Sequence, residues 1–144
     1  MALNFLDDLA EIPEVIDIRR DERVDPERIS AWIVKFQFEE AVVTIRFELG
    51  INPYLTITNM TVLPDSKQRN GYGKKAMNHL LKKAVRFNLF VVHATQVQNH
   101  VAGFWEKCGF KALNTVTADY KLSIEAYEMF KAEVDRETAA GHIY

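Results

Sequence analysis

The chain has 144 residues, of which 48% are hydrophobic and 11% aromatic, so it can bury a core and is not a disordered chain. Its formal net charge of -2 at pH 7 provides no overall attraction to nucleic acid or to an anionic membrane. The single cysteine, Cys108, excludes an internal disulfide and fits a reducing compartment. No apolar run is long enough to span a bilayer and no secretory signal is evident, so we expect a cytoplasmic protein.

The N-terminal third predicts a helix followed by strands. Apolar residues at helical spacing indicate a short helix that ends near Pro13: Leu3, Phe5, Leu6, Leu9 and Ala10. The side of this helix that faces water would hold Asp7, Asp8 and Glu11. Residues 14–20 form either a strand or an irregular edge, and Asp25-Pro26 indicates a turn.

Alternation of apolar and polar residues then predicts three antiparallel strands. The first run places Trp32, Val34, Phe36 and Phe38 on one face, and after Glu39-Glu40 a second run repeats the pattern from Val43 to Leu49. Two such runs joined by a short polar break are typical of a β-hairpin. Residues 54–63 form the third strand, since 56–63 is rich in β-branched side chains.

A polar turn over residues 65–73 leads into an amphipathic helix over residues 74–87. One face of this helix is apolar: Met77, Leu80, Leu81, Ala84 and Phe87. The other face is polar: Lys75, Asn78, His79, Lys82, Lys83 and Arg86. The turn therefore stands at a helix N-terminus, where free N–H groups attract anions, and Gly71 and Gly73 allow close approach. We expect it to bind a pyrophosphate; the alternative is that the glycines only form a tight turn.

The C-terminal half adds strands and two helices. Residues 89–97 are nearly continuously apolar, which predicts a strand buried on both faces and parallel to strand 56–63. Asn99 can cap a short helix that buries Val101, Phe104, Trp105 and Cys108 and ends at Gly109. Residues 110–122 supply one or two strands. A helix over 123–137, capped by Ser123, has an apolar stripe formed by Ile124, Tyr127, Phe130 and Val134.

Two blocks of this sequence together resemble the GCN5-related N-acetyltransferase (GNAT) superfamily. The first is Gln68-x-x-Gly71-Tyr72-Gly73, and the second, about thirty residues on, is Asn99-x-x-x-Gly103-Phe104-Trp105-x-Lys107-x-Gly109-Phe110. The resemblance covers residues 56–111 well and is nearest to the branch that acetylates histones and protein lysines. It implies an α/β (α+β) domain whose mixed, mostly antiparallel sheet is splayed around an acetyl-CoA cleft, with helices on both faces. We expect one domain over 1–144, with a core at 31–122, an N-terminal extension at 1–30 and a C-terminal helix at about 123–137.

The resemblance also implies which residues bind acetyl-CoA. The loop that holds the pyrophosphate would be Gln68, Arg69, Asn70, Gly71, Tyr72, Gly73 and Lys74. The end of the preceding strand, bulged away from strand 90–97, would pair with the pantetheine arm through Met60, Thr61, Val62 and Leu63. Asn99 would hydrogen-bond the arm, and Phe104 and Trp105 would pack near it. The alternatives are that Asn99 only caps a helix and that one of the two aromatic residues is ordinary core. No metal is implied.

Acetyl transfer needs an amine that loses a proton, a stabilised oxyanion and a departing thiolate. The resemblance implies that the backbone N–H of Val62 stabilises the oxyanion. Trp105 replaces the Tyr that many members use as an acid, but a thiolate of modest basicity can leave without one. The glutamate that the protein-acetylating branch uses as a base is replaced by Ile57, and residues 56–63 contain no carboxylate.

Several other residues are candidates for the missing acid and base. The candidate bases are Glu48 and His93, with Asp119, Glu125 or water as further alternatives. His93 is equally consistent with a satisfied histidine inside a strand. Cys108 could donate a proton or be acylated, but its place among apolar residues favours simple burial.

Two functions follow as alternatives. The first is an acetyl-CoA-dependent N-acetyltransferase that acts on a primary amine of a protein or small molecule. The second is a CoA-binding module that regulates a partner and transfers slowly or not at all. The short N-terminal region leaves little room for the two helices that usually follow the first strand in this family, and these helices often shape the acceptor side. The acceptor is unidentified, the mild acidity disfavours a nucleic-acid partner, and a homodimer through helix 123–137 is a further alternative.

Overall fold

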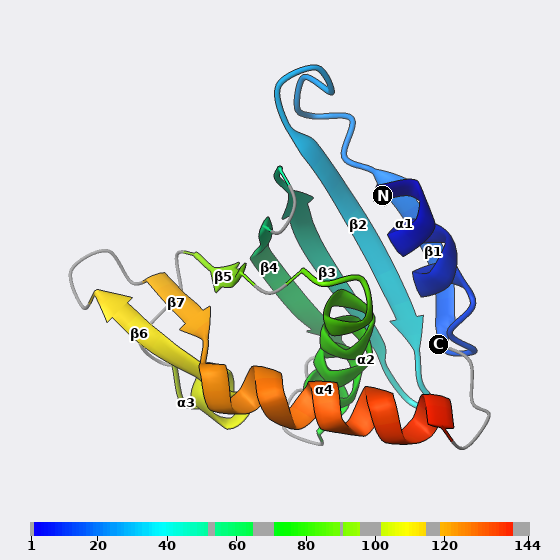
Figure 1. The fold of residues 1–144 in the computed structure, drawn as a ribbon. Coiled ribbons are helices and arrows are strands. Elements are labelled where there is room, and N and C mark those ends of the chain that lie inside the picture. Colours follow the sequence, from blue (N-terminus) through cyan, green and yellow to red (C-terminus); the bar gives the residue numbers. More distant parts are fainter. Residues whose placement is uncertain are drawn as a thin grey trace.

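The computed structural model describes residues 2–51, 54–64, 71–89, 91–95, 102–114 and 119–139, and within these ranges seven strands form one sheet (Figure 1). The strands are β1 (Val15–Arg20), β2 (Ser30–Gln37), β3 (Val42–Leu49), β4 (Tyr54–Leu63), β5 (Val91–Ala94), β6 (Phe110–Asn114) and β7 (Asp119–Leu122). The helices are α1 (Ala2–Ala10), α2 (Tyr72–Arg86), α3 (Ala102–Lys107) and α4 (Ile124–Ala139). The strand order is β1-β2-β3-β4-β5-β7-β6.

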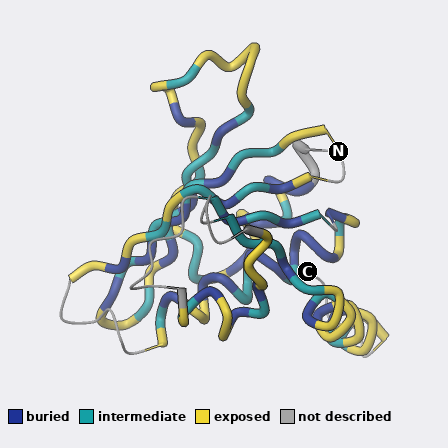
Figure 2. Tube along the Cα trace, turned by 90° about the vertical axis from the view of Figure 1, so that its left-hand side faces the viewer, coloured by how far each residue is buried: buried dark blue, intermediate teal, exposed yellow. Residues whose placement is uncertain are grey.

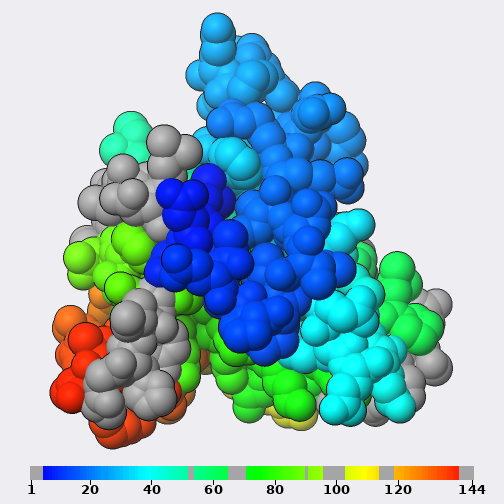
Figure 3. All heavy atoms as spheres, turned by 90° about the vertical axis from the view of Figure 1, so that its right-hand side faces the viewer, coloured from blue at the N-terminus to red at the C-terminus, as the bar shows by residue number. Residues whose placement is uncertain are grey.

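The predicted hairpin and the strand after it are confirmed. β2 and β3 pair in antiparallel register, with Phe36 opposite Val43 and Trp32 opposite Phe47, and β3 pairs in the same way with β4. Residues 15–20 form a true strand, β1, which lies antiparallel to β2 at the edge of the sheet. The link between β1 and β2, residues 21–29, contains turns and no helix. Figures 2 and 3 show this mostly exposed link projecting from one end of the molecule.

A β-bulge divides β4 into two parts. Arg46 pairs with Asn59 and Phe47 pairs with Ile57, so Thr58 is the extra residue on β4. Leu55 and Ile57 are buried before the bulge, whereas Val62 is buried after it. An extra residue reverses the alternation of a strand, so the bulge is what keeps apolar side chains on the same face along the whole length of β4.

β4, α2 and β5 form the predicted βαβ unit. β5 lies parallel to β4, and their paired residues run from Tyr54 with Val91 to Ile57 with Ala94. The N–H of Thr95 then donates to the carbonyl of Ile57 at 3.1 Å, directly before the bulge. β5 is shorter than the predicted strand and is buried on one face only, since Val92 and Ala94 are buried while Val91 and His93 are half-buried. The prediction of burial on both faces was therefore wrong.

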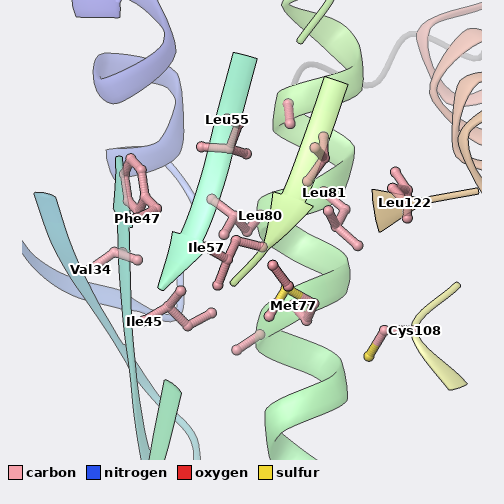
Figure 4. Packing of buried hydrophobic residues seen from close by; sticks show 14 of the residues in the cluster. Val34, Ile45, Phe47, Leu55, Ile57, Met77, Leu80, Leu81, Cys108 and Leu122 are labelled. Atoms are coloured by element: carbon pink, nitrogen blue, oxygen red, sulfur yellow. The ribbon is translucent and has the colours of Figure 1, made fainter. Parts of the chain in front are cut away.

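The core lies between one face of the sheet and the helices. Figure 4 shows Leu55 and Ile57 of β4 close to Leu80, Leu81 and Met77 of α2, all of which are buried. The other helices adjoin this core as well. Phe5 of α1 meets Phe47 at a ring distance of 6.1 Å, Trp105 of α3 meets Phe110 at 5.1 Å, and Phe130 of α4 is part of the same cluster.

These contacts confirm the predicted fold class and revise one detail of it. Helices were expected on both faces, but the contacts of the described residues place all four on one face. The other face of β1 to β4 carries polar side chains, because the residues that alternate with the core positions include Lys35, Thr44 and Arg46.

Three helical residues differ from the sequence pattern. Asp8 and Lys83 were both expected to face water, but Lys83 is buried with 3% of its surface exposed and its Nζ lies 2.8 Å from Oδ2 of Asp8. Ile124 was expected in the apolar stripe of α4 and is 76% exposed, because Ala126, Phe130 and Val134 form the buried side instead. The cap of α4 is confirmed, since the N–H of Ala126 donates to Oγ of Ser123 at 3.1 Å.

Candidate functional site

The first turn of α2 is arranged as an anion site. Gly71 precedes the helix in the left-handed conformation, with φ of 83°, and no side chain of the described residues caps this end. The first turn contains no acidic residue and does contain Lys74, which is exposed. The first N–H groups of a helix have no partner inside the helix and the dipole is positive there. This end of α2 therefore offers donors and positive charge without an acidic side chain from its own first turn.

Gly73 is the point at which α2, β4 and α3 meet. A methyl group added at Gly73 would lie 3.0 Å from Cε of Met60 and 3.4 Å from Cε1 of Phe104. Met60 stands near the end of β4 and Phe104 on α3, so three segments separated in sequence converge on the start of α2. The absence of a side chain at Gly73 allows this approach. These are three of the residues that the sequence assigned to one binding site, and the structure brings them together.

The two aromatic residues of α3 differ in their surroundings. Trp105 is buried and stacks edge-on against Phe110 at 5.1 Å and against Phe104 at 5.5 Å. Phe104 is half-buried and faces the start of α2. Trp105 thus belongs to the core, and Phe104 is the one of the pair that stands at the proposed site. The thiol of Cys108, one turn further on, is buried, and burial raises its pKa to about 11, so it stays protonated.

The remaining predicted binding residues lie around this point or outside the described ranges. Thr61 and Leu63 are exposed on β4, whereas Val62 is buried. Tyr72 is half-buried, and its ring stacks on Phe38 at 5.6 Å. Gln68, Arg69, Asn70 and Asn99 lie outside the described residues, so their assignment to the site stays a prediction.

The two candidate bases stand in one row on the face of the sheet away from the helices. Glu48 pairs with Thr56, Thr56 pairs with His93, and His93 pairs with Lys121, so these side chains lie side by side across β3, β4, β5 and β7. Two strand spacings separate Glu48 from His93, which is roughly 10 Å. The carboxylate of Glu48 accepts a hydrogen bond from Nη1 of Arg46 at 2.8 Å. Of the further alternatives, Asp119 is half-buried on β7, whereas Glu125 is exposed and pairs with Lys111 at 3.6 Å.

A buried polar network on this same face was not found from the sequence. Nε of Arg46 donates to Oδ2 of Asp21 at 2.7 Å, and Asp21 is only 3% exposed. Hydrogen bonds from Arg23 and Arg46 hold the pKa of the Asp21 carboxyl well below its usual range. Arg46 also donates from Nη1 to Oγ1 of Thr58, the bulge residue, at 2.7 Å. The sequence carries no local signal for this network, because Arg46 occupies an ordinary polar position in the alternation of β3.

This fold is an α/β domain in which α2, preceded by Gly71, connects the parallel strands β4 and β5. A sequence model of the acetyltransferase (GNAT) family matches residues 5–110, and the chain belongs to this family. No protein with curated annotation matches the sequence. In the described residues no helix is long and apolar enough to cross a membrane, and no group of histidine, cysteine and acidic side chains is placed to hold a metal ion.

Solved structures share the fold at low sequence identity. GCN5 from Tetrahymena has a TM-score of 0.54 and 16% identity, over 67% of this chain and 70% of that one. The ribosomal-protein-S18-alanine N-acetyltransferase from Escherichia coli has a TM-score of 0.50 and 14% identity, over 86% of this chain and 91% of that one. The likeness concerns the fold alone.

Proposed function

We propose that this protein is an N-acetyltransferase that moves the acetyl group of acetyl-CoA to a primary amine of a protein or small molecule. Membership of the acetyltransferase family supports the reaction class. The observation that carries the proposal is the start of α2, where Gly71 leaves the helix uncapped by any described side chain and no acidic residue occupies the first turn. Such a helix end favours binding of a phosphate group. The donor proposed for this family member is acetyl-CoA, and its diphosphate is the group that we propose to bind there.

The donor is proposed to extend from α2 along the end of β4. Residues 68–74 would hold the diphosphate, and the pantetheine arm would lie beside Met60 to Leu63, near Phe104 and Asn99. Support comes from the side chains of Met60 and Phe104, which occupy the space that a side chain at position 73 would need. Further support comes from the register, because the described part of β5 pairs with β4 only up to Ile57, the residue before the bulge. An extended arm can add to a strand edge in the manner of another strand.

The acceptor is proposed to reach the acetyl group from the face of the sheet that carries the Glu48 to His93 row. The opposite approach is filled, because Leu55, Ile57, Leu80 and Leu81 are packed between the sheet and α2 (Figure 4). The amine nitrogen gives up its proton and adds to the acetyl carbon, which places negative charge on the carbonyl oxygen, and the carbon–sulfur bond then breaks. The thiolate leaves without a side-chain acid, and the backbone N–H of Val62 is the proposed donor to the oxyanion.

His93 is the base that the geometry favours. The carboxylate of Glu48 is already engaged by Nη1 of Arg46 at 2.8 Å, so it would have to leave this ion pair to reach an amine. His93 is half-buried on β5 and pairs with Thr56 of β4. The next pair, Ile57 with Ala94, is the last between the described parts of these two strands. A neutral imidazole has a ring nitrogen that can accept a proton, as proton removal from an amine requires.

A CoA-binding module without transfer is the second candidate function. It is favoured by one observation: β4 carries no carboxylate, and the nearest one on β3, Glu48, is engaged by Arg46. Such a protein would bind acetyl-CoA, and this binding would regulate its interaction with a partner. The two functions share the donor site and differ only in turnover.

Two measurements test these proposals together. Calorimetric titration with acetyl-CoA should show saturable binding at one site, and a protein that does not bind acetyl-CoA would refute both functions. Incubation with acetyl-CoA and a panel of amines and peptides should then release free thiol with at least one acceptor. Tight binding with no thiol release across the panel would assign the module instead of the enzyme.

A further inference from the structure

Thr58, the extra residue of the β4 bulge, is held by two hydrogen bonds to a single residue of β3. Its Oγ1 accepts a hydrogen bond from Nη1 of Arg46 at 2.7 Å. Its hydroxyl also donates to the backbone carbonyl of Arg46 at 3.3 Å. A bulge leaves one residue without a partner in the strand ladder, and here the side chain of that residue is tied to the neighbouring strand.

Arg46 is in turn fixed from two other sides. Its Nε donates to Asp21 at 2.7 Å and its Nη1 donates to Glu48 at 2.8 Å. Asp21, which follows β1 directly, is held by Nε of Arg23 at 2.9 Å and by the backbone N–H of Arg23 at 3.0 Å. The guanidinium is a rigid fork, so anchoring it at several points leaves it little freedom to follow a shift of Thr58.

The bulge decides which side chains of β4 point toward α2. If Thr58 were to enter the ladder, every later residue of β4 would turn to the other face, because strand alternation has a period of two. Met60 and Val62 would leave the core, and Met60 would no longer meet the position of Gly73 at the start of α2. The bulge also lies directly after Ile57, the last residue of β4 that pairs with the described part of β5.

We infer that Arg46 is a positioning residue that locks the Thr58 bulge and thereby shapes the end of β4 for the pantetheine arm. This inference rests on the proposed function, since the arm is proposed to lie along Met60 to Leu63. The chain from Asp21 through Arg46 to Thr58 links the β1–β2 connection to the donor site. The network takes no part in the transfer itself; it orders the strand edge before the donor arrives, which lowers the entropic cost of binding.

A pair of substitutions at Thr58 separates the hydroxyl from the shape of the side chain. Thr58→Val is nearly isosteric and removes both hydrogen bonds, whereas Thr58→Ser retains the hydroxyl. Arg46→Met removes the guanidinium, and Lys35→Met serves as its matched control because Lys35 is a half-buried basic residue on the same face of the sheet. The wild type and all four variants would be compared by calorimetric titration with acetyl-CoA.

We expect Thr58→Val and Arg46→Met to bind acetyl-CoA about tenfold more weakly, which corresponds to about 1.4 kcal/mol. Thr58→Ser and Lys35→Met should stay within about twofold of the wild type. Amide hydrogen exchange of residues 57–63 should quicken in the two weakened variants and not in the other two. A double variant of Thr58→Val and Arg46→Met should be no weaker than either single variant, because both remove the same contact.

The wild-type titration distinguishes the two ways in which this test can fail. A wild type that does not bind acetyl-CoA refutes the proposed function. A wild type that binds, together with a Thr58→Val variant of equal affinity and unchanged exchange in β4, overturns the role of Arg46 and leaves the proposed function intact. Equal losses in Thr58→Val and Thr58→Ser would also overturn it, because the hydroxyl would then not be the cause.

Discussion

Lys83 of α2 and Asp8 of α1 form an ion pair inside the molecule, with Nζ and Oδ2 2.8 Å apart. Lys83 is buried, and this burial lowers its pKa even though Asp8 acts in the opposite direction. Arg86, one turn along α2, also approaches Asp8, at 3.3 Å. A single carboxylate thus connects two basic residues of α2 to α1, and it compensates a lysine that would otherwise be costly to bury.

Removing the charge of Asp8 should therefore destabilise the fold. We expect Asp8→Asn to lower the free energy of unfolding by about 2 kcal/mol, because a charge-assisted hydrogen bond to a buried group is lost. Asp7→Asn is the matched control, since Asp7 is exposed on the same helix. Urea denaturation measures both. In a Lys83→Met background the effect of Asp8→Asn should fall below about 1 kcal/mol; an undiminished effect would show that Asp8 acts elsewhere.

Gly109 is expected to be the least replaceable glycine among those described. Its φ of 99° suits glycine alone, and a methyl group there would lie 2.5 Å from Cβ of Ala126. Gly109→Ala should cost about 3 kcal/mol of unfolding free energy through strain and overpacking. Gly103→Ala is the control, because it lies inside α3 with open space around it, and it should be neutral or stabilising. Equal thermal unfolding temperatures for the two variants would contradict this account.

The elements that the sequence predicted well are those in which local pattern and burial agree. The alternation from Trp32 to Leu49 gave both strands of the hairpin, and the spacing from Met77 to Ala84 gave the buried side of α2. Ser123 was predicted to cap α4 and does so. The bulge also leaves a sequence signal, because the apolar positions of β4 advance by two up to Ile57 and then by three to Met60.

The buried ion pair of Lys83 and the hydrogen-bond network of Arg46 were not predicted, because both depend on contacts between residues that are distant in the sequence. Lys83 looks like a surface residue until α1 brings Asp8 beside it, and the two are 75 positions apart. Arg46 meets Asp21 across 25 positions and Thr58 across 12, so no local pattern marks the network. The candidate site was predicted from motifs, and among its described residues Met60 and Phe104 lie near the position of Gly73. Its role in binding stays a prediction.

The stability of the protein should depend on pH through His79. Burial lowers its pKa below the usual 6.5, the effect of Lys82 and Lys83 adds to this, and Glu14 at 3.5 Å opposes it. The unfolded state therefore takes up the proton first, so stability should fall as the pH drops below about 6.5. In His79→Gln, the difference in unfolding free energy between pH 8 and pH 5.5 should shrink. The lost stacking on Phe36 affects both pH values alike, so an unchanged difference would refute the role of His79.

Replacing His93 should reduce turnover without weakening the donor complex. Under the proposed function, His93→Gln keeps a polar side chain of similar size and should lower kcat about a hundredfold. The KM for acetyl-CoA should change little, since His93 lies on the acceptor side of the sheet. Steady-state kinetics with a responsive amine would measure both constants. The reverse result, in which Glu48→Gln lowers kcat about a hundredfold and His93→Gln does not, would assign the base to Glu48.

Charge alone should decide whether a side chain at Gly71 blocks the donor site. Asparagine and aspartate tolerate the left-handed conformation about equally and are both good helix N-caps, so Gly71→Asn and Gly71→Asp should fold with similar stability. Only the aspartate places a negative charge where a phosphate is proposed to bind. We expect Gly71→Asp to bind acetyl-CoA at least about tenfold more weakly than Gly71→Asn, with the gap narrowing at high salt. Calorimetric titration of the two variants measures this. Equal affinities would mean that the diphosphate does not lie at the start of α2.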